Sequence, residues 1–341
     1  MNQANSIRLG ENIMDMQALV LHRYNGPLEL TTLSRPVPQT GEVLVRIMAA
    51  GLNPLDTKIR AGSAAHAKHP LPLVLGVDMA GVIEAVGEGV TQFKAGDEVY
   101  GMTGGVAGIQ GSLAQFAAVD ARLIALKPSN LSMKEAAALP LSFITSYQGI
   151  VDRARVQAGQ TVLVQGGAGG VGHISVQLAK ALRARVFATV SEADVASMAR
   201  YGATGIDYRK FSVEQYVDAH TNGEGFDVVA DTVGGATLDA SFSAVKQFGH
   251  VVSALGWGTH ALAPLSFREA SYSGVFTLAP LLTGKHREHH GEILRAATAL
   301  VEDGKLVPKL DPRSFDLKSA EAAYQSMTEG AASGKLVIEI S

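Results

Sequence analysis

The 341-residue chain contains no cysteine, and this absence removes several kinds of chemistry at once. Without thiols the protein can form no disulfide bond, use no cysteine nucleophile and build no thiolate metal site. The formal net charge is only −3, which argues against nucleic-acid partners and against a membrane partner. No run reaches about 18 consecutive apolar residues, and residues 1–15 contain no apolar signal core. We therefore expect a cytoplasmic protein.

Apolar residues and glycine are abundant instead. Hydrophobic residues make up 47% of the chain, and there are 37 glycines. A chain of this length is expected to divide into about two domains, each with its own core. Residues 1–15 are predicted to form an N-terminal extension, to which we assign no function.

A buried strand, a glycine-rich turn and an amphipathic helix follow one another near the middle of the chain. The strand is predicted at residues 161–164, where an apolar run is typical of a strand buried on both faces. In the helix, Ile174, Leu178 and Leu182 recur at i, i+4 and i+8, which predicts one stripe packed on the sheet. This context is typical of a dinucleotide-binding fold.

Three glycines in the turn hold the GxGxxG spacing, and each has a predicted task. Gly167 allows the tight turn, Gly169 lets the backbone approach a pyrophosphate, and Gly172 lets the helix pack closely on the strand. The helix N-terminus offers free N–H groups to the phosphates. The turn is therefore predicted to bind a dinucleotide.

The rest of the chain changes character near residue 133. Before it, short segments separated by turn residues predict strands at 17–22, 28–33, 43–48, 82–86, 98–101 and 113–119. After it, helices are predicted at 134–138, 144–154, 193–201, 212–219, 237–248 and 289–302. Further strands are predicted at 185–189, 205–208, 227–231, 250–255, 274–278, 307–310 and 336–340. The alternation predicts an α/β protein with a doubly wound parallel sheet beside a β-rich domain.

The second predicted strand of this alternation ends without the carboxylate that binds the ribose of NAD. Thr189 and Ser191 leave room there for the 2′-phosphate of NADP, although acids at positions 192 and 194 would repel it. Tyr208 and Arg209 end the next strand and would supply a hydroxyl and a guanidinium; alternatively, Arg209 is a solvated surface residue. The pattern favours NADPH over NADH.

Several motifs occur in a recognisable order: GLNPLDTKIRAG at 51–62, PLVLGVDMAGVIEAVGEGV at 72–90, GDEVYG at 96–101, GFDVVADTVGG at 225–235 and GKLVIEI at 334–340. With the glycine turn, they resemble the zinc-independent, quinone oxidoreductase-like branch of the medium-chain dehydrogenases/reductases, which includes zeta-crystallin and the enone reductases. The resemblance implies a GroES-like catalytic domain at 16–140, a Rossmann domain at 141–284 and a return to the catalytic domain at 285–341.

The resemblance also argues against a metal. Zinc-dependent relatives have a cysteine at the position of Asn53 and a histidine at that of Val77. With no cysteine, such a tetrahedral site cannot be built. His286, His289 and His290 have a spacing that can chelate a metal, but their charged setting is typical of a solvated helix start. We predict that the protein uses no metal.

Hydride addition to an α,β-unsaturated carbonyl or a quinone leaves a negatively charged oxygen that needs a donor or a cation. The resemblance places Asn53 beside the nicotinamide and the substrate, where its amide would donate. Lys58 would supply a cation and a proton; alternatively, it is a surface lysine. Asp56 is expected to orient this loop. Typical quinone reductases of the branch have tyrosines at the positions of Lys58 and Ala64, so their loss favours activated alkenes.

Further cofactor contacts are implied by resemblance alone. They lie near the nicotinamide, the pyrophosphate or the ribose, and they are Thr145, Gly169, Gly170, Val171, Leu255, Gly256, Phe276, Thr277 and Lys335. Trp257, the only tryptophan, either forms a wall of the substrate cleft or covers a dimer strand.

Together these features predict an NADPH-dependent reductase of quinones or α,β-unsaturated carbonyls. Two alternatives stay open. One is an enoyl-thioester reductase, which would need a basic approach from Arg60, Lys68 and His69. The other is an NADPH-binding structural or sensor protein without catalysis. A homodimer paired through the strand at 272–278 is also expected from family precedent.

Overall fold

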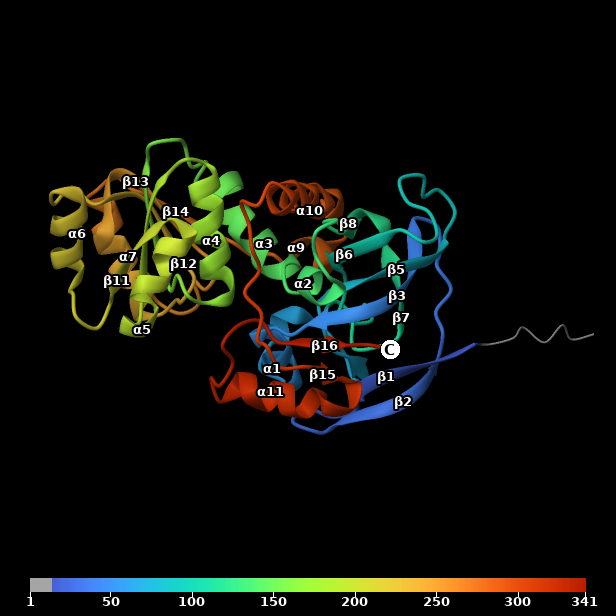
Figure 1. Ribbon diagram of the computed structural model, residues 1–341. Helices are drawn as coiled ribbons and strands as arrows, with labels where there is room; N and C mark the ends of the chain where they lie inside the picture. The colour runs from blue at the N-terminus through green and yellow to red at the C-terminus, as the bar shows by residue number, and fades with distance from the viewer. Residues whose placement is uncertain (1–13) are drawn as a thin grey trace, which may run out of the picture.

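The computed structural model describes residues 14–341, which form two units joined side by side (Figure 1). Most of the predicted extension, 1–15, lies outside the described residues. Its last position already belongs to the first strand, β1 (Asp15–Leu21).

The first unit is built on a seven-stranded sheet in the order β15-β16-β3-β5-β6-β8, with β7 paired to β3. A second sheet has the order β2-β1-β4. The remaining strands of this unit are β2 (Leu28–Ser34), β3 (Glu42–Gly51), β4 (Leu73–Val74), β5 (Asp78–Val86), β6 (Glu98–Met102), β7 (Phe116–Asp120), β8 (Ile124–Leu126), β15 (Phe315–Asp316) and β16 (Val337–Glu339).

The end of the chain contributes to this same sheet. β16 pairs antiparallel with β3, placing Val337 opposite Gly51. Figure 1 shows the red C-terminal strands beside the blue N-terminal ones. The last strand of the chain therefore lies beside β3, more than 280 positions earlier in the sequence. The exact domain boundaries at 140/141 and 284/285 stay predictions.

The second unit holds a six-stranded parallel sheet in the order β11-β10-β9-β12-β13-β14. The strands are β9 (Thr161–Gln165), β10 (Arg185–Val190), β11 (Ala203–Asp207), β12 (Phe226–Asp231), β13 (Val245–Ser253) and β14 (Ser271–Gly274). Val162, Leu163 and Val164 in β9 are fully buried, and Leu163 belongs to a different core cluster from its two neighbours. The predicted strand with two buried faces is confirmed.

Helices cover the parallel sheet and the junction between the units. They are α1 (Pro54–Arg60), α2 (Met133–Ala137), α3 (Pro140–Tyr147), α4 (Gly170–Ala181), α5 (Glu192–Val195), α6 (Val213–Thr221), α7 (Ala236–Ala244), α8 (Ala263–Ser266), α9 (Ala279–Thr283), α10 (Arg287–Glu302) and α11 (Ala320–Thr328). α3 packs on α4, and α10 contacts both α3 and β8, which ties the units together. α11 packs on β15 and β16 of the first unit.

Some predicted elements are wrong in position. The helix predicted at 237–248 ends at Ala244, where β13 begins, because Val245 is extended. The helix predicted at 144–154 begins earlier, at Pro140, whose fixed φ suits a first helical turn.

Two predicted strands differ as well. The strand predicted at 274–278 is β14, Ser271–Gly274; three of its four residues are polar or glycine, so no apolar pattern marks this sheet edge. Residues 307–310 form only an isolated bridge, between Leu310 and Lys335.

Candidate active site

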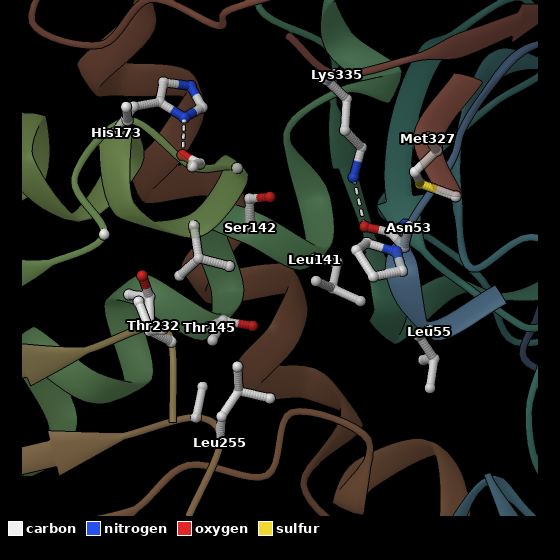
Figure 2. A pocket seen from close by; sticks show the side chains of 18 of the residues that line it. Asn53, Leu55, Leu141, Ser142, Thr145, His173, Thr232, Leu255, Met327 and Lys335 are labelled. Atoms are coloured by element: carbon white, nitrogen blue, oxygen red, sulfur yellow. Dashed lines mark hydrogen bonds between the residues drawn. The ribbon is translucent and has the colours of Figure 1, made fainter. Parts of the chain in front are cut away.

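A cavity of about 970 Å³ receives side chains from both units. It lies beyond the carboxyl ends of β9, β10 and β12, where β10 and β12 flank β9 on opposite sides. In sheets of this kind, ligands bind at that switch point. Figure 2 shows Thr145 and Leu255 on one side of the cavity, with Asn53 and Lys335 on the other.

The glycine turn forms one wall of this cavity. Its left-handed residue is Gly166, with a φ of +74°, one position before the predicted Gly167. A Cβ on Gly167 would lie 2.5 Å from the Ala188 Cβ, and one on Gly172 would lie 2.1 Å from the Gly166 oxygen. These two glycines do not line the cavity; they allow the strand, turn and helix to pack closely.

The N-terminus of α4 faces the cavity through Gly169, Gly170 and Val171. N–H groups in the first turn of a helix have no acceptor within the helix, and the helix dipole adds positive potential there. A 12-residue helix opening directly from a turn whose one side chain is the Ala168 methyl group fits a pyrophosphate. The Gly169 N–H already donates to the Gly166 oxygen at 3.0 Å, which leaves the N–H groups of Gly170 and Val171 for a phosphate.

Two hydroxyl side chains at the end of β10 are already engaged within the protein. The Thr189 hydroxyl donates to Gln165 Oε1 at 2.7 Å and accepts the Gly166 N–H at 3.1 Å. The Ser191 hydroxyl donates to Asp194 Oδ2 at 2.8 Å. Thr189, Ser191 and Asp194 all line the cavity, so a carboxylate lies at the predicted phosphate position.

Tyr208 lines the cavity, but Arg209 does not. The Arg209 guanidinium lies 5.5 Å from the centre of the Tyr208 ring. Arg209 therefore stacks beside the cavity rather than pointing into it.

The nicotinamide side is formed by α3 and by the segments after β13 and β14. The Thr145 and Thr277 hydroxyls are 2.9 Å apart and hydrogen-bonded, and Leu255 and Phe276 lie beside them on the cavity wall. Gly256 is not on the wall; a Cβ there would lie 2.1 Å from the Tyr272 hydroxyl oxygen.

A buried polar cluster lies opposite the nicotinamide side. Asn53 Nδ2 donates to Asp78 Oδ2 at 2.9 Å and to the Gly51 oxygen at 3.3 Å. The Lys335 ammonium donates to Asn53 Oδ1 and lies 3.3 Å from Asp78 Oδ2. Lys335 can donate only, which fixes the orientation of the Asn53 amide. Both amide N–H groups of Asn53 are thus used inside the protein.

Asp78 is the anion of this cluster. It is fully buried and also accepts the Leu141 N–H at 2.9 Å. Burial raises the pKa of Asp78, while the Lys335 ammonium and the hydrogen bonds oppose that shift. The cluster therefore pairs one buried carboxylate with one nearly buried ammonium.

Asp56 lies behind the cavity and does not line it. One of its carboxylate oxygens accepts the Asn53 backbone N–H at 2.8 Å, while the other has no partner within residues 14–341. Burial raises the pKa of Asp56 to about 7. This contact fixes Asn53, the residue that precedes α1; the loop-orienting role of Asp56 stays a prediction.

Lys58 is on α1, is exposed and lines the cavity. Its ammonium makes no hydrogen bond or ion pair with the part of the chain that the structure describes. A cation that is not neutralised by the protein is available to a ligand.

Comparison with known proteins agrees with this arrangement. Residues 39–129 match the alcohol dehydrogenase GroES-like domain, and residues 201–338 match a model described as zinc-binding dehydrogenase. The NADPH-dependent alkenal/one oxidoreductase of Arabidopsis thaliana is 35% identical over 95% of this chain and 79% of its own length. The quinone oxidoreductase of Homo sapiens is 28% identical, covering 95% of this chain and 97% of its own.

A solved structure from Novosphingobium aromaticivorans, an alcohol dehydrogenase superfamily protein, is 56% identical and superposes with a TM-score of 0.94. The match covers 96% of this chain and 100% of the Novosphingobium chain. The chain is a medium-chain dehydrogenase/reductase of the quinone and enone reductase branch. This oxidoreductase therefore has the predicted pair of domains, GroES-like and Rossmann, and acts with a nicotinamide cofactor.

The side chains of this reductase do not fit the zinc site of its zinc-binding relatives. Within residues 14–341, no group of three or more His, Asp or Glu residues is arranged to hold a metal ion. Asp78, beside Asn53, is neutralised by Lys335. His289 instead lies 2.9 Å from both Asp152 and Glu292, and His290 is buried.

Several residues in or behind the reductase's cavity have no role predicted from the sequence. Asp78 lies behind the wall, and no local signal in the sequence pairs it with Lys335. His173 lies on α4, lines the cavity and contacts the Gly169 oxygen at 2.9 Å; its Nε2 is buried without a partner in the described chain. His66 and Ser142 also line the wall.

None of the described helices is long and apolar enough to span a membrane.

Proposed function

We propose that the protein is an NADPH-dependent, zinc-independent reductase that adds hydride to the C=C bond of an α,β-unsaturated carbonyl or to a quinone. The observation that supports this most is the juxtaposition across one cavity of a dinucleotide-binding turn and an unpaired lysine, Lys58. The relatives named above act on alkenals, enones or quinones by their names.

When bound, the dinucleotide supplies hydride. The α4 N-terminus would hold its pyrophosphate, and the wall around Thr145 and Thr277 would hold its nicotinamide. Addition to the β-carbon of an enone moves the π electrons onto the carbonyl oxygen, which becomes an enolate. We assign stabilisation of that oxygen to the Lys58 ammonium, because Lys58 faces the cavity without a carboxylate partner in the described chain. A proton from water then adds at the α-carbon, which gives the saturated ketone.

The structure changes what we propose for Asn53. Its amide hydrogens are donated to Asp78 and Gly51, so we assign it the role of holding Lys335 rather than direct donation to substrate. Lys335 can make three hydrogen bonds and uses two in this cluster, which leaves one N–H for a ligand in the cavity.

Replacing Lys58 with alanine is expected to lower kcat/KM for enones about a hundredfold, since one oxyanion donor contributes that much. NADPH affinity, measured by titration, should change less than about twofold, because Lys58 touches no part of the glycine turn. The assay is NADPH consumption with 2-alkenals, ring enones and quinones, before and after dialysis against a chelator. Lys285→Ala removes another exposed lysine away from the cavity and is the control.

Unchanged turnover in Lys58→Ala would remove its proposed role. Loss of turnover on chelation would reject the zinc-independent mechanism. NADPH binding without turnover of any compound in this panel would favour the structural or sensor alternative.

We propose NADPH rather than NADH as the physiological cofactor, and Asp194 is the residue that tests this. Its carboxylate bonds the Ser191 hydroxyl and lines the cavity, so it repels a 2′-phosphate. Asp194→Asn is expected to lower the KM for NADPH about fivefold, as removal of one nearby charge would. The KM for NADH should be unchanged, and Glu224→Gln, on the far side of the domain, is the control. A native preference for NADH would contradict the proposal.

The enoyl-thioester alternative receives less support. Arg60 forms a bidentate ion pair with Glu321, with hydrogen bonds of 2.7 and 2.9 Å, and His69 is buried with its pKa lowered by burial. Only Lys68 is left exposed for a phosphorylated carrier. Turnover of an enoyl-CoA ester, added to the same substrate panel, would support the enoyl-thioester reductase alternative.

We also propose a cytoplasmic homodimer. β14 is an edge strand of the parallel sheet, with one side paired to β13. Edge-to-edge pairing with a second copy would satisfy its free backbone groups. Sedimentation velocity that gave only the monomer mass would reject the dimer.

A further inference from the structure

Three aromatic rings meet across the cavity. The His66 and Trp257 rings are stacked with centroids 5.2 Å apart, and the Phe276 ring lies edge-on to the indole at 6.2 Å. His66 also contacts Phe276 at 6.0 Å. All three residues line the cavity wall. The three rings form a corner, which we call the aromatic corner (His66, Trp257 and Phe276).

The rings come from different units. His66 lies in a single helical turn, Ala65–Ala67, of the GroES-like unit. Trp257 follows β13 and Phe276 follows β14, both in the Rossmann unit. The corner therefore depends on the way the two domains face each other.

These rings are poorly buried for their size. Trp257 is 54% exposed and Phe276 is 39% exposed, although each touches two other rings. Large aromatic residues gain stability by burial, so the exposed parts of Trp257 and Phe276 leave apolar surface for a ligand to cover. A flat ring is the shape that covers it best, because aromatic pairs favour stacked and edge-to-face contacts.

The corner is next to the proposed reacting groups. Phe276 directly precedes Thr277, whose hydroxyl bonds Thr145 on the nicotinamide side. Lys58, on the opposite domain, lies eight positions before His66 in the sequence and lines the same cavity. Lys58 and the aromatic corner therefore share one cavity.

We propose that the aromatic corner selects substrates in which the enone or quinone is conjugated to, or part of, a planar ring system, over substrates with flexible alkyl chains. The ring packs on the part of the Trp257 indole that the His66 ring does not cover, beside Phe276. This inference rests on the proposed function, because it names the substrate class of that same site.

The kinetic test compares two ketones with the same reactive group, 4-phenylbut-3-en-2-one and non-3-en-2-one. In Trp257→Leu and Phe276→Leu, the ratio of kcat/KM for the aryl over the alkyl ketone is expected to fall about threefold to tenfold, which is the effect of one aromatic contact. Trp257→Phe should restore most of the ratio. Phe267→Leu removes an 82% exposed phenylalanine that is not on the cavity wall and should leave the ratio unchanged.

Binding gives a readout that needs no turnover. Trp257 is the only tryptophan, so its fluorescence reports on the corner alone. With NADP⁺ present, the saturated product 4-phenylbutan-2-one is expected to quench this fluorescence, and nonan-2-one to quench it at least threefold less at equal concentration.

The outcomes separate the two proposals. Equal quenching by both ketones, or an equal loss of activity toward both enones in Trp257→Leu, overturns the proposed ring selectivity of the aromatic corner. Neither result contradicts the proposed reductase activity. Selective quenching without turnover of either enone supports the corner as a ring-binding site and rejects the reductase.

Discussion

Replacing Lys335 with methionine is expected to lower the free energy of unfolding at pH 7 by about 3 kcal/mol, which is the cost of leaving a buried charge unpaired. Lys335 is the cation that contacts both Asp78 and Asn53, and its side chain is only 9% exposed. Methionine keeps the length of the side chain but not the charge. Urea unfolding of the two proteins measures the difference.

A second substitution tests the cause. The double variant Lys335→Met with Asp78→Asn has no buried carboxylate, so about 2 of the 3 kcal/mol of stability should return. The rest stays lost because the new amide at position 78 would have one acceptor oxygen, whereas Asp78 has two, for the Leu141 N–H and the Asn53 amide. Lys309→Met is the matched control, since this lysine lines the same cavity without an ion pair in the described chain. A control as costly as Lys335→Met would mean that lost packing explains the effect.

Asp56 is expected to make the protein less stable as the pH rises from about 4 to about 7. Burial raises its pKa from 3.8 to about 7 in the folded state. Between these two values the folded protein binds a proton that the unfolded chain has released, so stability falls with increasing pH and is constant above about 7. The full shift corresponds to about 4 kcal/mol, at 1.36 kcal/mol per pKa unit.

Asp56→Asn removes this titration and keeps an oxygen for the Asn53 N–H. The loss of stability between pH 5 and pH 8 should be about 2–3 kcal/mol smaller in the variant than in the native protein. Asp78 has a raised pKa as well, so some loss remains. Asp303→Asn, at an exposed carboxylate, is the control. The same loss in Asp56→Asn as in the native protein would mean that Asp56 keeps an ordinary pKa.

The glycine turn could be predicted because its information is local. Strand, turn and helix are consecutive, and an apolar run, a glycine spacing and a helical stripe each appear within a few residues. The strands of the parallel sheet were found for the same reason, apart from β14. Its residues Ser271–Gly274 carry little apolar signal, because a strand at the sheet edge has less surface to bury.

Side-chain directions could not be predicted. The position of Arg209 at a strand end indicates a phosphate contact, but its guanidinium stacks on Tyr208 beside the cavity. Gly256 has the expected place along the chain, yet it packs against the Tyr272 hydroxyl and does not line the cavity. Rotamers and close contacts of this kind depend on neighbours from other strands.

The sequence by itself determined that this protein has no thiol chemistry, that it carries a dinucleotide-binding turn, and that Asn53 and Val77 stand where zinc ligands would be needed. Only the tertiary structure decided how its charges are paired. Asp78 and Lys335 are 257 positions apart and meet because β16 pairs with β3, which in turn pairs with β5. Such long-range contacts form when distant segments share a sheet, and no spacing along the chain encodes them.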